Sequence, residues 1–213
     1  MNMIKNKISP ELRSRFTEDI KKSKESGKER GFFLCENKEG KLIPAESREG
    51  TEVDIHLGDA RTGCPSGTKT YGEFHTHTYL YTVKKELRKE GKIGPNEELK
   101  IDKELKIRMS KNIKEAHERI TGVKGITINT PSYTDVLRAL LGKSINVTNG
   151  TICTSTDVET NKVECWTIKD LGKDKLKKLA IIGMKELDKV KPTGSQLMKK
   201  WLDDISDRET IEL

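Results

Sequence analysis

The spacing of apolar residues along the chain predicts alternating helices and strands. Leu12, Phe16 and Ile20 recur at every fourth position, which predicts an amphipathic helix over residues 10–25. Short apolar runs bounded by polar turns predict strands at residues 31–35, 41–45, 52–57, 72–77, 125–128, 144–154 and 162–168, the first two joined as a hairpin. Helical spacing predicts further helices at residues 131–141, 174–190 and 195–205. This order predicts an α/β (α+β) fold in which a mixed β-sheet is flanked by helices.

The segment between residues 78 and 131 differs in character from the rest of the chain. Ile101, Leu105 and Met109 have helical spacing within a highly charged run, which predicts a helical insertion. The segment holds 13 Lys and Arg against 8 Asp and Glu, so it supplies most of the net charge of +7. The expected organisation is a core formed by residues 1–77 and 125–170, a basic helical insertion at residues 78–124, and C-terminal helices at residues 171–213 packed on the core.

Composition narrows the class of protein. With 213 residues, 32% of them hydrophobic and 35% charged, the chain can bury one main core beneath a highly charged surface. The net positive charge favours acidic partners in general, whether nucleic acid, an anionic membrane or an acidic protein. The first 16 residues contain no apolar run long enough for a signal peptide, and no later run approaches the roughly 18 apolar residues of a membrane-spanning helix. A soluble, cytoplasmic protein with no membrane partner is therefore expected.

The four cysteines are scattered and form no CxxC pair, so they predict neither a zinc knuckle nor a redox motif. In a reducing compartment they are expected to be unpaired thiols, and Cys64 is interpreted as a free thiol on a loop. Cys153 and Cys165 flank a predicted hairpin and could approach each other. A disulfide between them is the less favoured alternative.

The strongest chemical signal is the pair of histidines His75 and His77. Residues i and i+2 of an extended chain point to the same face, so both imidazoles can bind one ion from the end of a strand. A catalytic zinc ion needs one further protein ligand and an open position for water. Asp135 is the candidate, because it follows Ser132 by three residues at the start of a predicted helix. The alternative is that Ser132 and Asp135 form only a helix capping box.

Taken in chain order, Glu29 before an apolar strand, His75-x-His77 and Ser132-x-x-Asp135 resemble the JAMM (MPN+) family of metalloproteases. The resemblance covers residues 10–170 and implies a JAMM/MPN-like, that is cytidine-deaminase-like, fold. It implies that His75, His77 and Asp135 bind Zn2+ together with a water molecule. It also implies that Glu29 is the general base and acid and that Ser132 stabilises the oxyanion. These roles agree with the general chemistry of zinc hydrolases.

The chain departs from the family pattern in two ways. The serine of the family follows the second histidine after a handful of residues, whereas 54 residues separate His77 from Ser132 here. Thr78 also stands where a proline is usual. Such an insertion is thermodynamically tolerable if its ends meet in space. It leaves the substrate class open, and Glu25 and Glu36 remain alternatives to Glu29 as the general base.

Three functions follow from these observations, in decreasing order of preference. The first is a JAMM-like peptidase or isopeptidase that cleaves an amide or isopeptide bond of a protein substrate, for which the resemblance suggests a conjugate of a ubiquitin-like modifier. The second is a catalytically inactive MPN-like binding module whose basic insertion binds nucleic acid or an acidic protein. The third is a metal-dependent nuclease, which ranks lowest because the sequence contains no cluster of carboxylates suited to two magnesium ions.

Overall fold

The computed structural model describes residues 4–52, 54–97, 130–189, 202 and 204–213. Its centre is a seven-stranded mixed sheet with the order β2-β1-β4-β5-β6-β7, and β3 pairs with β1. The strands are β1 (Arg30–Glu36), β2 (Leu42–Pro44), β3 (Arg48–Glu49), β4 (Lys69–His77), β5 (Thr151–Thr156), β6 (Lys162–Ile168) and β7 (Ser206–Glu212). β4 and β5 are parallel and all other pairs are antiparallel. The predicted mixed sheet is therefore confirmed.

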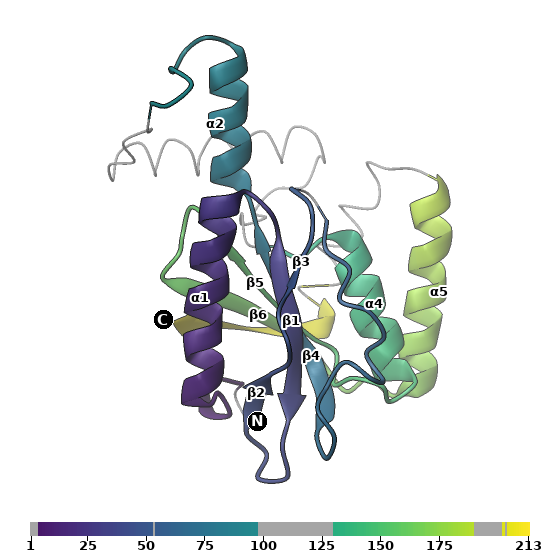
Figure 1. Cartoon of the computed structure of the whole chain (residues 1–213). Helices are drawn as coiled ribbons and strands as arrows, with labels where there is room; N and C mark the ends of the chain where they lie inside the picture. Colours follow the sequence, from purple (N-terminus) through teal and green to yellow (C-terminus); the bar gives the residue numbers. More distant parts are fainter. Residues whose placement is uncertain (1–3, 53, 98–129, 190–201, 203) are drawn as a thin grey trace.

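Helices cover both faces of this sheet (Figure 1). The helical elements are η1 (Ile4–Asn6), α1 (Pro10–Ser26), α2 (Tyr79–Lys89), α4 (Tyr133–Ser144) and α5 (Lys173–Lys189). α1 lies on one face, α4 and α5 lie on the other, and α2 projects from the end of β4 (Figure 1). α1 has well-defined ends because the Ser9 side chain accepts a hydrogen bond from the Leu12 N–H and Gly27 closes the helix in the left-handed conformation, with φ of 68°.

The alternation of side chains along the strands decides which residues meet which helices. On the α1 face, the core contains Phe16, Phe32 and Phe74 together with aliphatic residues of α1, β1 and β6. The opposite face carries a second cluster, in which Leu140 of α4 and Ile152 of β5 pack together. Since Phe74 points towards α1, its neighbours in β4 point towards α4. This alternation directs the predicted metal ligands to the α4 face.

Several predicted elements need correction. The described residues of the segment 52–57, which are 52 and 54–57, form no strand, and the strand predicted at residues 144–154 begins only at Thr151. The C-terminal segment, residues 171–213, is predicted to contain only helices, the last ending at residue 205, but Ser206–Glu212 forms β7 along the edge of β6. Its sequence was misleading because polar residues dominate it and Ile211 is its one buried apolar side chain. The strand predicted at residues 125–128 and most of the helices predicted within residues 78–124 and at 195–205 lie outside the described residues.

The prediction of unpaired thiols is wrong for all four cysteines. Cys35 and Cys64 form one disulfide, and Cys153 and Cys165 form another. The second pair lies directly across the β5–β6 ladder, with a Cα–Cα distance of 4.0 Å, so strand register alone brings the two residues together. The first pair joins β1 to the loop before β4. Among the described helices, none has both the length and the apolar character needed to cross a membrane.

Candidate metal centre

The candidate site is built on one face of β4. Glu73, His75 and His77 alternate along this strand, so their side chains project towards α4. Gly31 of β1 pairs with His75, and a Cβ atom at position 31 would lie 2.3 Å from the Phe74 carbonyl oxygen and 3.0 Å from the His75 Cβ. The absence of a side chain at Gly31 therefore lets β1 approach β4 next to His75.

The first turn of α4 brings Asp135 to this face. Ser132 is the N-cap: its side chain accepts a hydrogen bond from the Asp135 N–H, and its own N–H donates to Asp135 Oδ2 at 2.8 Å. The capping box considered as an alternative is thus present. The same Asp135 Oδ2 atom also lies 3.4 Å from Nε2 of His75. The Asp135 carboxylate can therefore cap α4 and lie next to His75 at the same time.

The distances between these atoms suit a small cation. Nε2 of His75 lies 3.2 Å from Nε2 of His77 and 3.4 Å from Asp135 Oδ2. Two ligand atoms of a tetrahedral zinc ion, each bonded at 2.0–2.1 Å, are separated by about 3.3 Å. Both distances from His75 agree with this spacing. A donor set of imidazole nitrogens and carboxylate oxygens is also one that zinc prefers.

Glu73 is a further candidate ligand that the sequence analysis missed. One carboxylate oxygen of Glu73, one ring nitrogen of His75 and one carboxylate oxygen of Asp135 lie within 4.8 Å of one another. His77 contacts His75 but is not part of this group of ligand atoms, so the structure brings Asp135 to His75 without placing His77 beside Asp135. Arg138, one turn after Asp135 in α4, donates to Asp135 Oδ1 at 2.6 Å and to Glu73 Oε1 at 3.1 Å. The signal for Glu73 was present, because it precedes His75 by two residues in the same strand.

The site concentrates negative charge around one buried imidazole. Burial lowers the pKa of His75, but the charges of Asp135, Glu73 and Glu29 outweigh this effect and raise the pKa to about 9. For Asp135, burial raises the pKa, but the stronger opposing influences of His75, Ser132 and Arg138 hold it well below its usual range. In the metal-free protein Arg138 and protonated His75 face the carboxylates of Asp135 and Glu73, and a bound cation would take the place of the His75 proton.

His75 is held through one side of its ring. Its Nε2 faces Asp135 and His77, whereas its Nδ1 is buried and has no hydrogen-bond partner among the described residues. Nε2 is therefore the ring nitrogen that faces the acidic side chains, and its distances to Asp135 and His77 match those between two ligands of one metal ion. The residues present fit a metal ion at this position.

Glu29 immediately precedes β1 and is 8% exposed. Its N–H donates to the Thr51 carbonyl oxygen at 2.7 Å, and its own carbonyl oxygen accepts from the Gly50 N–H at 2.8 Å, so its backbone is fixed. Burial raises the pKa of Glu29 to about 7, and His75 and Asp135 are among the charges that act on it. The alternatives are less suitable, because Glu25 is exposed on α1 and Glu36 is ion-paired with Lys7 at the far end of β1.

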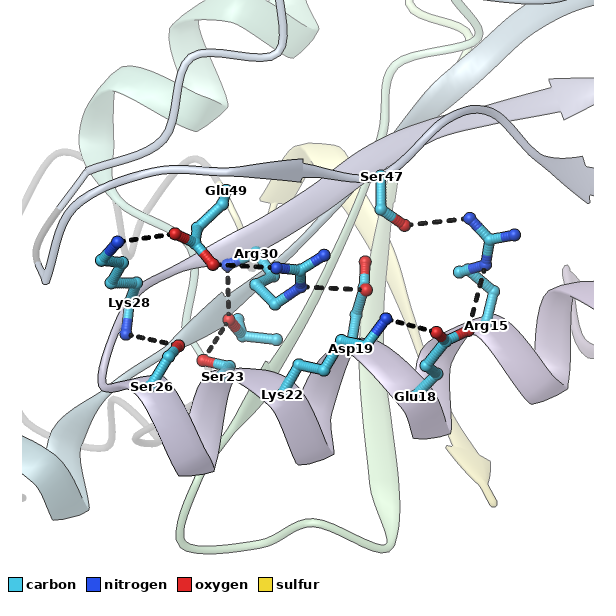
Figure 2. Close-up of polar contacts among 11 residues, drawn as sticks. Arg15, Glu18, Asp19, Lys22, Ser23, Ser26, Lys28, Arg30, Ser47 and Glu49 are labelled. Atoms are coloured by element: carbon cyan, nitrogen blue, oxygen red, sulfur yellow. Dashed lines mark hydrogen bonds and ion pairs between the residues drawn. The ribbon is translucent and has the colours of Figure 1, made fainter.

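A polar network between α1 and β1 supports the position of Glu29. Figure 2 shows Arg30, the next residue, between Asp19 of α1 and Glu49 of β3. Nε of Arg30 lies 3.1 Å from the carboxylate of Asp19, which is 1% exposed, and Nη1 lies 3.0 Å from Glu49. The Arg30 N–H also donates to Thr76 of β4 at 2.9 Å. Contacts of Arg30 with α1, β3 and β4 thus fix the start of β1 directly after Glu29.

Comparison with known proteins leaves the site to be interpreted from its own geometry. The chain matches no family model, and no match is found among curated proteins or solved structures. The geometry described above shows a buried group of Glu73, His75 and Asp135 whose ligand atoms are close enough to hold a metal ion.

Proposed function

We propose that this protein is a zinc-dependent hydrolase of amide or isopeptide bonds, similar in fold and mechanism to the JAMM (MPN+) metalloproteases. The observation that carries the proposal is the pair of distances from Nε2 of His75, 3.2 Å to His77 and 3.4 Å to Asp135. In the proposed site, His75 and His77 of β4 and Asp135 of α4 would bind the zinc and leave a fourth position for water, as a catalytic zinc requires.

The order of the motifs along the fold supports the same proposal. Glu29 precedes β1, the two histidines end β4, and Ser132 and Asp135 open α4, after which the chain enters β5 and β6. This is the arrangement that the resemblance to the JAMM family implies. Glu73 is proposed to remain paired with Arg138 beside the ligands, where it holds Asp135 in place through that arginine.

Each side chain then has a role in amide hydrolysis. Zinc, when bound, supplies a water of lowered pKa and a Lewis acid for the substrate carbonyl group. Glu29, whose pKa burial raises to about 7, accepts a proton from the attacking water and returns it to the leaving amine. The hydroxyl proton of Ser132 is free to donate to the developing oxyanion, because the oxygen of that group accepts from Asp135.

The proposed substrate class comes from the resemblance. It is a protein conjugate in which a ubiquitin-like modifier is joined to a lysine side chain. Nucleic acid is not favoured as a partner, since only 5% of the residues are aromatic and their spacing shows no pattern suited to base stacking.

The test begins with metal content. Purified protein dialysed against trace zinc should retain about one zinc ion per chain by elemental mass spectrometry, and His77→Ala should lose it. The zinc-loaded protein should hydrolyse a peptide that carries a lysine-linked isopeptide bond. Glu29→Gln should lower kcat by about 100-fold or more while retaining zinc.

Two matched variants sharpen this test. Glu25→Gln and Glu36→Gln make the same chemical change at the two alternative positions and should leave kcat within about twofold of the unsubstituted protein, because neither side chain approaches the histidines. Protein that binds no zinc under these conditions would overturn the proposal. Equal loss of activity in Glu25→Gln and Glu29→Gln would overturn the role of Glu29.

A further inference from the structure

A cavity of about 220 Å³ lies beside the candidate metal centre, on the same face of the sheet. It is partly open to solvent and is lined by the second half of α4 and by residues 57–61, which belong to the connection from β3 to β4 and run alongside α4 (Figure 1). Apolar side chains supply much of its wall, among them Phe33, Leu57, Ala60, Leu141, Ile145 and Val147. The cavity is therefore suited to an apolar group.

The cavity shares a wall with the metal centre. Glu73 and Arg138 line it, and the same two side chains contact or approach the candidate ligands. Arg138 lies 2.6 Å from Asp135, and the Glu73 carboxylate lies within 4.8 Å of a ring nitrogen of His75. Because an extended peptide advances about 3.3 Å per residue, a side chain in the cavity belongs to a residue within one or two positions of the reacting amide.

The two charged side chains that the cavity shares with the metal centre, Glu73 and Arg138, are already paired, whereas Asp59 and Arg61, which also line the cavity, are exposed. Glu73 and Arg138 lie 3.1 Å apart, and Arg138 also pairs with Asp135. A charged substrate group would have to displace these pairs, at the cost of leaving a partly buried charge unmatched. An uncharged, apolar side chain avoids that cost and removes apolar surface from water.

The size of the cavity limits its occupant to one side chain. An engineered protein cavity of about 150 Å³ is large enough to bind benzene, whereas sites for drug-sized ligands are about 300 Å³ or larger. A cavity of about 220 Å³ lies between these sizes. Leu141 and Ile145 at its wall are 43% and 45% exposed, so apolar surface is open to solvent there and can be covered by a ligand.

We propose that this cavity is a specificity subsite that takes one aromatic or branched aliphatic side chain of the substrate, next to or one residue from the scissile amide. The inference rests on the proposed amide hydrolase function, and it specifies which substrate side chains the enzyme prefers. It assigns to Leu141 and Ile145 a role in substrate choice that is separate from the chemistry of the metal ligands.

Binding can be tested without catalysis. The zinc-loaded, isotopically labelled full chain is titrated with N-acetyl-phenylalaninamide, followed by amide chemical shifts, with N-acetyl-alaninamide as the control ligand. The phenylalanine derivative should shift the amides of residues 57–61 and 141–148 in a saturable manner, and the alanine derivative should bind at least about tenfold more weakly. Shifts confined to other regions, or equal binding of both ligands, would overturn the subsite.

Variants at the cavity wall provide the second test. Leu141→Asp and Ile145→Asp each place a charge in the cavity wall at a half-exposed position, so the fold should persist and affinity for the phenylalanine derivative should fall at least about tenfold. Ile182→Asp is the matched control, since Ile182 is 50% exposed on α5 and does not line the cavity. Both wall variants binding as tightly as Ile182→Asp would contradict the proposal.

Activity then separates the two proposals. Peptide amides with Phe or Leu beside the scissile bond should show kcat/KM values at least about tenfold above those with Ala, and Leu141→Asp should reduce this ratio towards one. Hydrolysis without side-chain preference would refute the subsite and leave the hydrolase standing. Specific binding in the cavity without any hydrolysis would refute the hydrolase and leave the apolar binding site.

Discussion

Oδ2 of Asp135 lies 3.4 Å from Nε2 of His75 and accepts the N–H of Ser132 at 2.8 Å. One carboxylate thus caps α4, approaches the imidazole of β4 and pairs with Arg138 through its other oxygen. The position of the helix and the assembly of the candidate metal centre therefore depend on the same side chain. Different substitutions of Asp135 can therefore test metal binding and helix capping separately.

Asp135→Asn and Asp135→Ala should differ in stability and agree in metal binding. The Asn side chain can still accept a hydrogen bond from the Ser132 N–H, whereas Ala cannot, so the Ala variant of the metal-free protein should be less stable by about 1 kcal/mol. Both variants lack the anionic ligand and should bind zinc at least about 100-fold more weakly. Denaturant unfolding and chelator competition measure the two quantities. Wild-type zinc affinity in Asp135→Asn would show that the carboxylate is not a ligand.

Zinc affinity should rise with pH. In the metal-free protein His75 has a pKa of about 9, against 6.5 for an unperturbed histidine, so zinc must displace a proton at neutral pH. Affinity should increase by up to about tenfold per pH unit below about pH 9 and level off above it. Competition with a chelator of known pH dependence measures the slope. A flat profile would contradict a proton held at this nitrogen.

The stability of the metal-free protein should show the opposite slope. Because the folded pKa of His75 is raised, the stabilisation from its proton is complete below pH 6.5 and is lost as the pH rises through about 9. The free energy of unfolding should therefore fall over this range, and His75→Gln should reduce the slope. His56→Gln, which changes an exposed histidine away from the site, should leave the slope unchanged. Equal slopes in all three proteins would refute the assignment.

Gly31→Ala should disturb the site without touching a ligand. The added methyl group would lie 2.3 Å from the Phe74 carbonyl oxygen and 3.0 Å from the His75 Cβ, so β1 and β4 must separate. We expect a loss of about 1–3 kcal/mol in the free energy of unfolding and weaker zinc binding. Gly94→Ala is the matched control, because its nearest contact would be an ordinary 3.5 Å. Thermal and denaturant unfolding of the two variants should differ clearly, and similar values would argue against close β1–β4 contact.

Cys64→Ala should lower stability under non-reducing conditions by about 2–4 kcal/mol, because the disulfide to Cys35 closes a loop with a sequence separation of 29. Thiol titration of the unfolded, unreduced protein should find no free thiol in the original chain and one in the variant. Reduction of the original chain should remove most of the stability difference. Free thiols in the original protein would instead support the unpaired cysteines that its sequence suggested.

Local spacing was enough to predict α1, the β1–β2 hairpin, β6 and the common face of His75 and His77. These features depend on the helical period and on the alternation of a strand, both of which are set by neighbouring residues. The same information failed for β7, whose few apolar residues give little local signal. Pairing along β6 supplies the missing hydrogen bonds and the burial of Ile211.

The sequence alone determined the kinds of chemical group available: two histidines in one strand, a capped helix that begins with a carboxylate, and a glutamate before β1. Only the tertiary structure brought Asp135 to His75, added Glu73 and Arg138 to the site, and joined Cys35 to Cys64. Contacts of this kind depend on the order of strands in the sheet and on the path of the chain between them. Periodicity within a segment carries no information about that path, because it reports which face a residue occupies and not which distant segment will cover that face.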